Sequence, residues 1–491
     1  MSGNRVLHRL SRARLPDKAE ELLAAGFRLA LVAAHDDGDR LRVVYLFLAG
    51  RPDRRIELEC IVPAADPTLP SLAYLSFPAS RFEREMADLY GIRPIGHPRP
   101  RRLVRHAHWP ENWHPMRADA ATAPEFEPTG RFPFVTVEGT GVYEIPVGPV
   151  HAGLIEPGHF RFSVVGETIL RLKARLWFVH RGLEKLFHGR APTDAVELAE
   201  RISGDTSAGH ALAHSLAIED ALGIDIPDKV HRLRALVLEL ERLHNLAADL
   251  GLLANDVGFS LANAHAQRIR ERLMRINADV TGHRLLRGAI APGRVVLRDL
   301  PDPTELRAIA ADLAEVAELT LRNGVVHDRF AGTAVLAPDD ARAMGCLGYV
   351  ARASGIRTDA RVDHPTTELP VVEAGSLAGD VLARYTVRRD EFAASAELLC
   401  YLIESHSGPT EYIESAPGGT GPSAGVGIVE GWRGTIVHRV EIDGERITRA
   451  KIVDPSWFSW PALPVAMADT IVPDFPLANK SFNLSYAGND L

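Results

Sequence analysis

Apolar and polar residues change their spacing several times along the chain, and the first region has the pattern of a small α+β unit. Two apolar runs, at 28–34 and 41–48, flank an Asp-Gly pair at 37–38. A pair of this kind between such runs indicates a β-hairpin. Residues 55–62 alternate between apolar and polar side chains, which predicts a third strand packed on one face. We therefore expect a small α+β domain at residues 1–93.

A helix and then a linker are expected next along the chain. Residues 80–90 have helical character, with Ser80 as the expected N-cap and Gly91 as the residue that ends the helix. Residues 94–133 hold eight prolines and many aromatic and histidine residues, without a clear period. Such a composition predicts a linker that lies pinned across a surface rather than a flexible one.

The remainder of the chain, residues 134–491, has the pattern of a large helix-rich domain. Strand-like runs come first, at 134–147 and 159–172. Helical patterns then predict helices at 208–222, 230–253, 264–287, 302–322 and 389–404. A glycine-rich stretch at 417–427 and a strand pair at 434–442 and 445–453 follow. The expected fold class is α+β, with peripheral strands around the helices of the large domain.

Composition narrows the class of protein. The 491 residues are too many for one compact core, and 46% hydrophobic with 24% charged residues is typical of globular chains. A net charge of −8 argues against a nucleic-acid binder. No apolar run is long enough to cross a bilayer, and the N-terminus lacks the apolar core of a signal peptide, so we expect a cytoplasmic location. The three cysteines form no C-x-x-C pair, which argues against a disulfide framework.

Candidate chemistry is concentrated just before the helix expected at 208–222. Ser203, Gly204 and Asp205 give a polar, flexible approach to this helix, which carries His210 and His214. The segment is either the entrance to a pocket or simply a capped helix start. The two histidines are one turn apart, but without an H-E-x-x-H motif they fit a core pair better than metal ligands.

Three further places carry polar residues in unusual surroundings. Asp454 and Pro455 precede small hydroxyl residues and three aromatic residues, a pattern most often found in a packed turn. Arg433 lies between glycines. Asp249 and Asp256 lie near the end of a strongly apolar helix, and a buried aspartate needs a partner or a raised pKa. The structural reading is that such an aspartate pairs with an arginine, for example Arg242.

Several ordered motifs resemble one known family over nearly the whole chain. RFERE, DLYGI and GHP, between residues 81 and 98, resemble the 30-kDa subunit of respiratory complex I. Later motifs resemble the 49-kDa complex I subunit and the large subunit of membrane-bound, energy-converting nickel–iron hydrogenases. These motifs are GPVH at 148–151, EPGHF at 156–160, HRGLEK at 180–185, DR at 328–329 and RASGI at 352–356. The fused order resembles the large subunit of formate hydrogenlyase, and the resemblance implies the fold of this family.

The chain departs from the hydrogenase branch at the metal ligands. Catalytic members hold nickel and iron with four cysteines, in R-x-C-G-x-C-x-x-x-H and D-P-C-x-x-C. The frames of both motifs are kept here, but the ligand positions carry Ser203, Thr206, Ser456 and Ser459. Thiolates are the soft ligands that such metals need, whereas hydroxyls are hard and weak ones. The resemblance therefore implies that this chain holds no nickel–iron centre and does no hydrogen chemistry of the usual kind.

The chain also departs from the quinone branch of the family. The tyrosine that meets the quinone in that branch corresponds to Gly204, and its histidine corresponds to Ile155. The aspartate that orients this histidine corresponds to Asp256, which is kept. Glu430 and Arg433 are further polar residues carried over by the resemblance.

The resemblance implies a subunit of a complex I-like oxidoreductase, peripheral on the cytoplasmic side of the cell membrane. Its expected partners are an Fe–S small subunit and membrane-embedded proton- or ion-pumping subunits. The chain itself is expected to bind no cofactor, although a quinone or small carrier could enter the cavity between the former cysteine loops. Arg201, His210, Asp256 and Arg433 are expected to converge there, with Asp205 as a compensating charge and Ser203, Ser456 and Ser459 lining the gap. The alternative is that these groups form a sealed polar network that binds no ligand. The alternative is a non-redox structural or coupling subunit, so whether the chain is itself an enzyme stays open.

Overall fold

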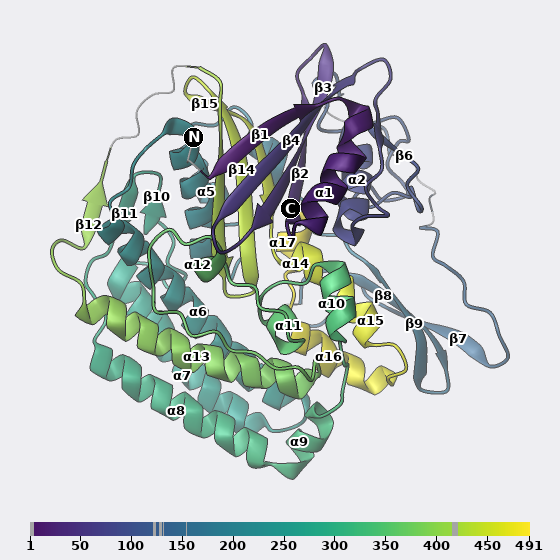
Figure 1. The fold of residues 1–491 in the computed structure, drawn as a ribbon. Coiled ribbons are helices and arrows are strands. Elements are labelled where there is room, and N and C mark those ends of the chain that lie inside the picture. Colours follow the sequence, from purple (N-terminus) through teal and green to yellow (C-terminus); the bar gives the residue numbers. More distant parts are fainter. Residues whose placement is uncertain (1–3, 121–123, 127–129, 131, 154, 415–420) are drawn as a thin grey trace.

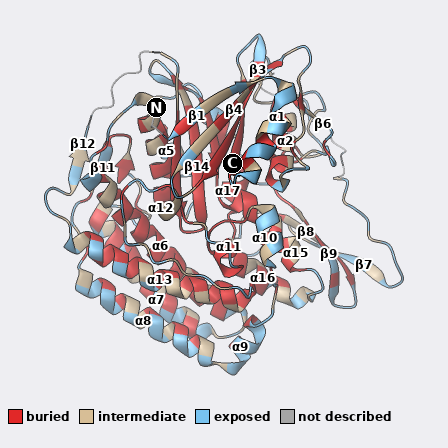
Figure 2. Cartoon of the chain, viewed as in Figure 1, coloured by how far each residue is buried: buried red, intermediate tan, exposed pale blue. Residues whose placement is uncertain are grey.

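Two β-sheets lie against each other in the upper half of the molecule, and long helices form a layer below them (Figure 1). The computed structural model describes residues 4–120, 124–126, 130, 132–153, 155–414 and 421–491. Buried residues concentrate in the sheets and on the facing sides of the helices, while the outer faces are exposed (Figure 2). The fold class is therefore α+β, as the sequence predicts.

The N-terminal sheet has the strand order β1-β4-β3-β2, with β1 parallel to β4 and the other pairs antiparallel. Its strands are β1 (Arg5–Leu10), β2 (Arg28–Asp36), β3 (Arg40–Ala49) and β4 (Arg54–Pro63). The hairpin and the third strand predicted from sequence are confirmed. Strand β1, the 3-10 turn η1 (Arg12–Arg14) and helix α1 (Leu15–Ala24) were not predicted. Only the first residue of β1 is buried, so its sequence lacks the alternation that reveals a strand.

Helix α2 (Phe77–Tyr90) packs on this sheet and begins earlier than the sequence predicts. Ser76 stands at the N-cap position and Pro78 lies in the first turn, where a proline costs no hydrogen bond. The prediction of Ser80 as N-cap is wrong, because its hydroxyl donates to the Phe77 carbonyl inside the helix. Gly91 ends the helix with a φ of 75°, as expected for a C-terminal glycine.

The proline-rich segment is held in place by buried charges. Short parallel strands β5 (Thr68–Pro70) and β6 (Arg93–Ile95) lead into it. One Asp88 oxygen accepts hydrogen bonds from the backbone N–H groups of three consecutive residues, at 2.7, 2.8 and 3.2 Å. Arg175 donates to the carbonyls of the same three residues, Leu103, Val104 and Arg105. The segment is thus pinned without regular structure, while the domain boundaries at 93 and 133 stay a prediction.

Another sheet, formed by three strands between the proline-rich segment and the helices, projects from one side of the molecule (Figure 1). Its strands are β7 (Val142–Val147), β8 (His159–Val165) and β9 (Thr168–Arg175). The run predicted at 159–172 is two strands rather than one, because Gly166 turns the chain with a φ of 59°. The run predicted at 134–147 becomes a strand only from Val142 onward.

The helical layer is built around α6, which packs against α7 and α13. Helix α8 packs against α7 and α13 on the side away from the sheets (Figure 1). The five helices predicted from their apolar spacing are α5 (Ser207–Leu222), α6 (Asp228–Asp256), α7 (Ser260–Thr281), α8 (Pro303–Arg322) and α13 (Val381–Glu404). Helix α13 begins at Val381 rather than at residue 389, and Asp380 caps it by accepting from the Ala383 N–H. The shorter helices are α3 (Leu183–Phe187), α4 (Val196–Ala199), α9 (Gly324–Phe330), α10 (Pro338–Met344), α11 (Gly348–Ala353) and α12 (Ala360–Asp363).

The last part of the chain returns to the centre of the molecule. It contains β13 (Ser423–Gly431), β14 (Gly434–Asp443), β15 (Arg446–Val453), α14 (Ser456–Ser459), α15 (Ala462–Ala466), η2 (Val472–Asp474), α16 (Phe475–Phe482) and α17 (Tyr486–Asp490). A small sheet of β10 (Ile290–Ala291), β11 (Arg294–Val296) and β12 (Glu411–Ile413) lies apart from it.

The glycine-rich stretch predicted at 417–427 is in part a strand. Its residues 417–420 lie outside the described residues, whereas Gly425 and Gly427 belong to β13. A Cβ atom on either glycine would come within 2.0 Å or 1.9 Å of a carbonyl oxygen of α5. The glycines therefore let helix α5 approach the strand closely.

Buried ion pairs join the N-terminal sheet to the β13–β15 sheet. Glu57 of β4 pairs with Arg5 at 3.4 Å and with Arg439 of β14 at 3.1 Å. Arg42 of β3 donates to Glu441 of β14 at 2.8 Å and 2.9 Å. Separating the two sheets would leave these charges unpaired, so the ion pairs fix the register of one sheet on the other. Among the described residues, no helix has the length and the apolar character needed to span a bilayer.

Candidate functional site

The loop before α5 and the turn that forms α14 lie side by side in the structure. Nε2 of His210 lies 3.1 Å from Oδ2 of Asp454, and its Nδ1 lies 3.0 Å from Nε2 of His438. All three side chains are buried. Burial lowers the pKa of His438 well below its usual value, so this imidazole is neutral. A buried polar row thus runs from β14 through α5 to the end of β15.

The C-terminal segment enters the space between the two loops. The hydroxyl oxygens of Ser203 and Ser485 are hydrogen-bonded at 2.8 Å. The Ser485 N–H donates to the Ser456 hydroxyl oxygen at 3.0 Å. Ser485 therefore bridges the two loops at positions where the hydrogenase branch would carry cysteines. Sequence reasoning missed Ser485; its one local signal is that it caps α17 by accepting from the Gly488 N–H.

The other two hydroxyl positions are also committed to protein contacts. The Thr206 hydroxyl donates to Asp205 at 3.1 Å. Ser459 is hydrogen-bonded to Cys346, whose thiol pKa is raised to about 12 by burial. Among the residues with described positions, no group of three or more His, Cys, Asp or Glu is arranged to hold a metal. Because the donors are hydroxyls bonded within the protein, this set does not fit a nickel–iron centre.

An ion pair marks the side of the site that reaches the surface. Arg433 donates to both oxygens of Asp205, at 2.7 and 2.6 Å, and its guanidinium stacks on the Trp432 ring. Burial would raise the pKa of Asp205, but the ion pair with Arg433 lowers it to about 2. The Asp205 side chain is 40% exposed, and no described atom lies within 4 Å of where a Cβ of Gly204 would point. Asp205 is therefore a fixed anion beside an opening to the surface.

Two residues expected at the centre of the site lie elsewhere. The Arg201 side chain is exposed and donates to the Glu197 carbonyl one turn earlier. Asp256 is the last residue of α6 and is exposed. It lies seven residues past Asp249, which is about 10 Å along a helix. The expected convergence of Arg201 and Asp256 with His210 is therefore not seen, because Arg201 is exposed and bonded to Glu197 and Asp256 lies at the exposed end of α6.

Asp249 is the acid of α6 that connects to the site. Its Oδ2 pairs with Arg388 at 3.0 Å, and its Oδ1 accepts from the Asn483 side chain at 2.5 Å. The Asn483 carbonyl in turn accepts from Nε of Arg433 at 2.6 Å. The structural reading, in which the buried Asp249 pairs with an arginine, therefore holds, but the partner is Arg388 and not Arg242, which pairs with Glu239 one turn earlier in the helix.

Glu430 and Ile155 were both expected as ligand contacts, and the structure gives them other surroundings. Glu430 accepts from Arg352 and from the Thr435 hydroxyl, at 3.0 and 2.9 Å, inside a buried ion network. This network occupies both of its oxygens, because the second also accepts the Ala360 N–H. Ile155 is 50% exposed, whereas its neighbour Glu156 reaches α17 and accepts the Ala487 N–H. Neither side chain is positioned as a ligand contact between the two loops.

The start of α5 is capped from another helix. Glu241 of α6 accepts the N–H groups of Ala208 and Gly209, at 2.6 and 2.9 Å. Thr206 stands at the N-cap position but its side chain makes no capping bond. The expected capped helix start is therefore present, with the cap supplied by a buried carboxyl whose pKa burial raises to about 8. The sequence offered no local signal for a cap 33 residues away.

Three families match successive parts of the chain. Residues 9–125 match "Respiratory-chain NADH dehydrogenase, 30 Kd subunit". Residues 181–248 match "Nickel-dependent hydrogenase", and residues 256–418 match "Respiratory-chain NADH dehydrogenase, 49 Kd subunit". The order of these matches follows the order of the motifs seen in the sequence.

Individual relatives match over most of their length. Hydrogenase-4 component G of Escherichia coli K12 is 32% identical over 453 residues, covering 89% of this chain and 78% of that protein. Formate hydrogenlyase subunit 5 of the same organism is 31% identical, covering 87% and 78%. The C/D component of the NADH-quinone oxidoreductase of Bacteroides thetaiotaomicron is 29% identical, covering 83% and 82%.

A solved structure shares the fold. A chain of the membrane-bound sulfane sulfur reductase, described as an archaeal respiratory membrane complex, superposes with a TM-score of 0.65. The superposition covers 72% of this chain and 99% of that chain, at 24% identity. At this identity the likeness concerns the fold alone.

Proposed function

The chain belongs to the family of fused complex I 30-kDa/49-kDa-type subunits of membrane-bound hydrogenases and NADH-quinone oxidoreductases, and from this premise we propose that it works as a subunit of a membrane-associated, complex I-like oxidoreductase. Its role there is electron transfer coupled to proton or ion translocation, without nickel–iron hydrogen chemistry. The expected donor is an Fe–S cluster in a small partner subunit. Membrane-embedded pumping subunits would hold the assembly on the cytoplasmic side of the membrane.

One observation carries the proposal. The two loops of the family's reaction site are kept and lie together, yet all four ligand positions carry hydroxyl residues bonded within the protein. Loops kept in contact by a buried row of His438, His210 and Asp454 argue for a retained role of this region. The loss of thiolates argues that the role is not metal-based hydrogen chemistry.

The surface beside Gly204 is where an electron acceptor would meet this chain. Reduction of a quinone to the quinol takes two electrons and two protons. A quinone at this surface would receive the electrons from the Fe–S subunit and the protons from solvent. Asp205 would face such a carrier, held in place by the buried guanidinium of Arg433, which stacks on Trp432. Asp205 would act as a fixed anion rather than as a proton donor, because its pKa of about 2 keeps it ionised at neutral pH.

A second candidate function is non-redox coupling, and one contact favours it. Ser485 fills the space between Ser203 and Ser456, so the interior of the former metal site is occupied by the chain's own C-terminal segment. A packed, hydrogen-bonded junction of this kind can transmit movement between the Fe–S side and the membrane side of a complex without passing electrons.

Purification of the intact membrane complex separates the two candidates. Electron paramagnetic resonance would identify Fe–S clusters, and a soluble quinone analogue would report electron transfer after chemical reduction of those clusters. The electron-transfer proposal expects quinone reduction that falls in Arg433→Gln and is unchanged in the exposed control Arg268→Gln. Cluster reduction without any electron transfer to an acceptor would favour the coupling role instead.

A further inference from the structure

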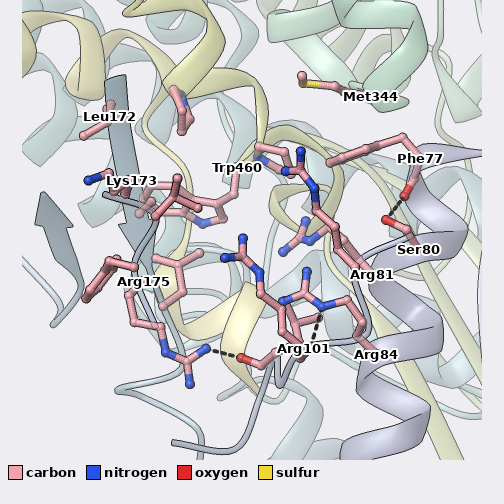
Figure 3. Close-up of a pocket in the computed structure, with 18 of the residues that line it drawn as sticks. Phe77, Ser80, Arg81, Arg84, Arg101, Leu172, Lys173, Arg175, Met344 and Trp460 are labelled. Carbon is pink, nitrogen blue, oxygen red and sulfur yellow. Dashed lines mark hydrogen bonds between the residues drawn. The ribbon is translucent and has the colours of Figure 1, made fainter. Parts of the chain in front are cut away.

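A cavity of about 510 Å³ lies where α2, the segment after β6, strand β9 and the α14–α15 region meet (Figure 3). None of the four hydroxyl residues at the former metal site lines it. Its position between the N-terminal region and the large domain brings together residues that are far apart in the sequence. Nothing in the proposed function accounts for this cavity.

Positive charge dominates the cavity wall. The cationic residues that line it are Lys173 and six arginines, Arg81, Arg84, Arg99, Arg101, Arg171 and Arg175. Among the described residues that line it, none carries a carboxylate. Lys173 is neutralised by Glu144 at 2.5 Å, which lies outside the lining, so the arginines carry the excess charge.

The inner arginines are hydrogen-bonded without being neutralised. Arg84 donates to the carbonyls of Arg101 and Arg102 at 2.7 and 3.0 Å, and Arg81 donates to the Trp457 carbonyl. Arg175, only 3% exposed, donates to three carbonyls, while its Nε has no hydrogen-bond partner among the described residues. Carbonyl oxygens accept hydrogen bonds but add no net charge, so the guanidinium charges remain.

The carboxylates that attract the inner arginines lie outside the lining of the cavity. They are Asp88, Asp490 and Glu85, and Glu85 is itself paired with Lys451 at 2.8 Å. Burial, together with the neighbouring charge of Arg84, lowers the pKa of Arg81 to about 9. Burial also lowers the pKa of Arg84 and of Arg175 to about 10, with a contribution from Arg101 in each case. Holding these cations together therefore costs stability, and an anion in the cavity would relieve that cost.

The outer arginines are free to bind a ligand. Arg99, Arg101 and Arg171 are exposed, and their guanidinium groups make no hydrogen bond or ion pair with any described residue. Phe77 also lines the cavity, beside Arg81, and is 40% exposed, whereas Trp460 in the same lining is almost fully buried (Figure 3). The cavity thus combines a cationic lining with one exposed aromatic ring, and its volume is within the usual range of about 300–1,000 Å³ for small-molecule sites.

We propose that this cavity binds an organic phosphate, with the phosphate held by Arg84, Arg101 and Arg171 and the apolar body packed against Phe77. Guanidinium groups match phosphate oxygens in pairs, and several of them together suit a dianion better than a single carboxylate. The phosphate could belong to a soluble metabolite or to the headgroup of an anionic lipid, because both present the same group to the arginines.

Isothermal titration calorimetry of the full-length chain with phenyl phosphate tests the proposal. The double variant Arg101→Gln with Arg171→Gln removes two unpaired charges from the rim, so the fold should be kept. A matched control, Arg268→Gln with Arg275→Gln, removes two charges from exposed positions on α7. We expect saturable binding that weakens at least about tenfold in the rim variant, is unchanged in the control and weakens with added salt.

A second arm identifies the source of the phosphate. Vesicles of phosphatidylcholine with and without phosphatidic acid are sedimented with the chain and with both double variants. Saturable binding of phenyl phosphate assigns a soluble ligand, and binding only to phosphatidic acid vesicles, lost in the rim variant, assigns a lipid headgroup. Equal binding by the rim variant and the control, or no binding in either arm, would overturn the proposal.

Discussion

Nε2 of His210 lies 3.1 Å from Oδ2 of Asp454, so a single buried contact joins two loops that are 244 residues apart in the sequence. Asp454 also accepts the Ser456 N–H at 2.8 Å through its other oxygen, which shapes the turn into α14. The carboxylate therefore holds the turn and the α5 loop at once. Loss of its charge should loosen both.

Asp454→Asn should lower stability in a pH-dependent way. Burial would raise the pKa of Asp454, but the hydrogen bond from His210 and the charge of Arg433 lower it overall. A lowered carboxyl pKa contributes stability above the ordinary value of about 4, and this stability is lost as pH falls through the folded-state pKa. We expect a loss of about 1–3 kcal/mol at pH 7 and a smaller loss below about pH 4, measured by urea unfolding. The exposed control Asp328→Asn should match the parent, and an unchanged pH profile in Asp454→Asn would contradict the argument.

The Asp205–Arg433 pair should show strong coupling in a double-mutant cycle. Asp205→Asn leaves the buried Arg433 without a counter-charge, as Arg433→Gln leaves Asp205. Each change should cost about 1–2 kcal/mol, less than the about 3–5 kcal/mol of a fully buried pair because Asp205 is 40% exposed. The double variant should cost less than the sum of the two.

The pH dependence of the same variants gives an independent check. Since the pKa of Asp205 is lowered to about 2, its contribution is present above about pH 4 and lost as pH falls toward about 2. Asp205→Asn should therefore differ from the parent at about pH 6 and approach it at about pH 2. Strictly additive effects of the two single variants would rule out the pairing.

Asp249 and Asp256 form a matched pair on one helix and should behave differently. Asp249→Asn leaves Arg388 unpaired in the core, and we expect a loss of about 3 kcal/mol in the free energy of unfolding. This is the lower end of the range for buried pairs because burial raises the pKa of Asp249, partly offset by Arg388. Asp256→Asn changes an exposed side chain and should stay within about 0.5 kcal/mol of the parent. Equal losses from urea unfolding would show that the burial of Asp249 does not govern its role.

Much of the fold could be predicted because its main elements have regular spacing. Helices α5 to α8 carry apolar stripes, and the hairpin of β2 and β3 turns at an Asp-Gly pair. Strand β13 could not be predicted, because its glycines serve the approach of α5 rather than a turn. Packing of this kind depends on an element about 200 residues away, which local spacing does not reveal.

The candidate site was predictable in its loops and not in its detailed contacts. The frames around His210 and Asp454 pointed to both loops, because the motif order resembles the family. The bridging Ser485 is 282 residues from Ser203, and its one local signal, the N-cap of α17, does not point to the site. Asp256 was predicted because it corresponds to the aspartate of the quinone branch, whereas Asp249, about two turns earlier in α6, is the one that neighbouring elements cover. Tertiary burial decided the difference.

The chain should behave as a peripheral subunit. We expect an alkaline carbonate wash to release it from membranes, since no helix in the described ranges can span the bilayer and its family members belong to membrane-bound complexes. Immunoblots of the washed pellet and supernatant measure the release, with a membrane-embedded partner as the retained control. Retention of this chain after the partners are stripped would contradict protein-mediated attachment.

The purified complex should contain no stoichiometric nickel. The four ligand positions carry Ser203, Thr206, Ser456 and Ser459, and hydroxyls stay protonated at neutral pH, so they offer neither the charge nor the softness of thiolates. Ser203 and Ser456 are also hydrogen-bonded to Ser485, so their oxygens are committed to contacts within the protein. Elemental analysis by plasma mass spectrometry after chelation measures the nickel content. A four-cysteine member of the nickel-dependent family, purified in parallel, should retain its metal under the same chelation. One nickel per chain in this protein, retained through chelation, would require a ligand set that the described residues do not provide and would refute the proposed loss of hydrogen chemistry.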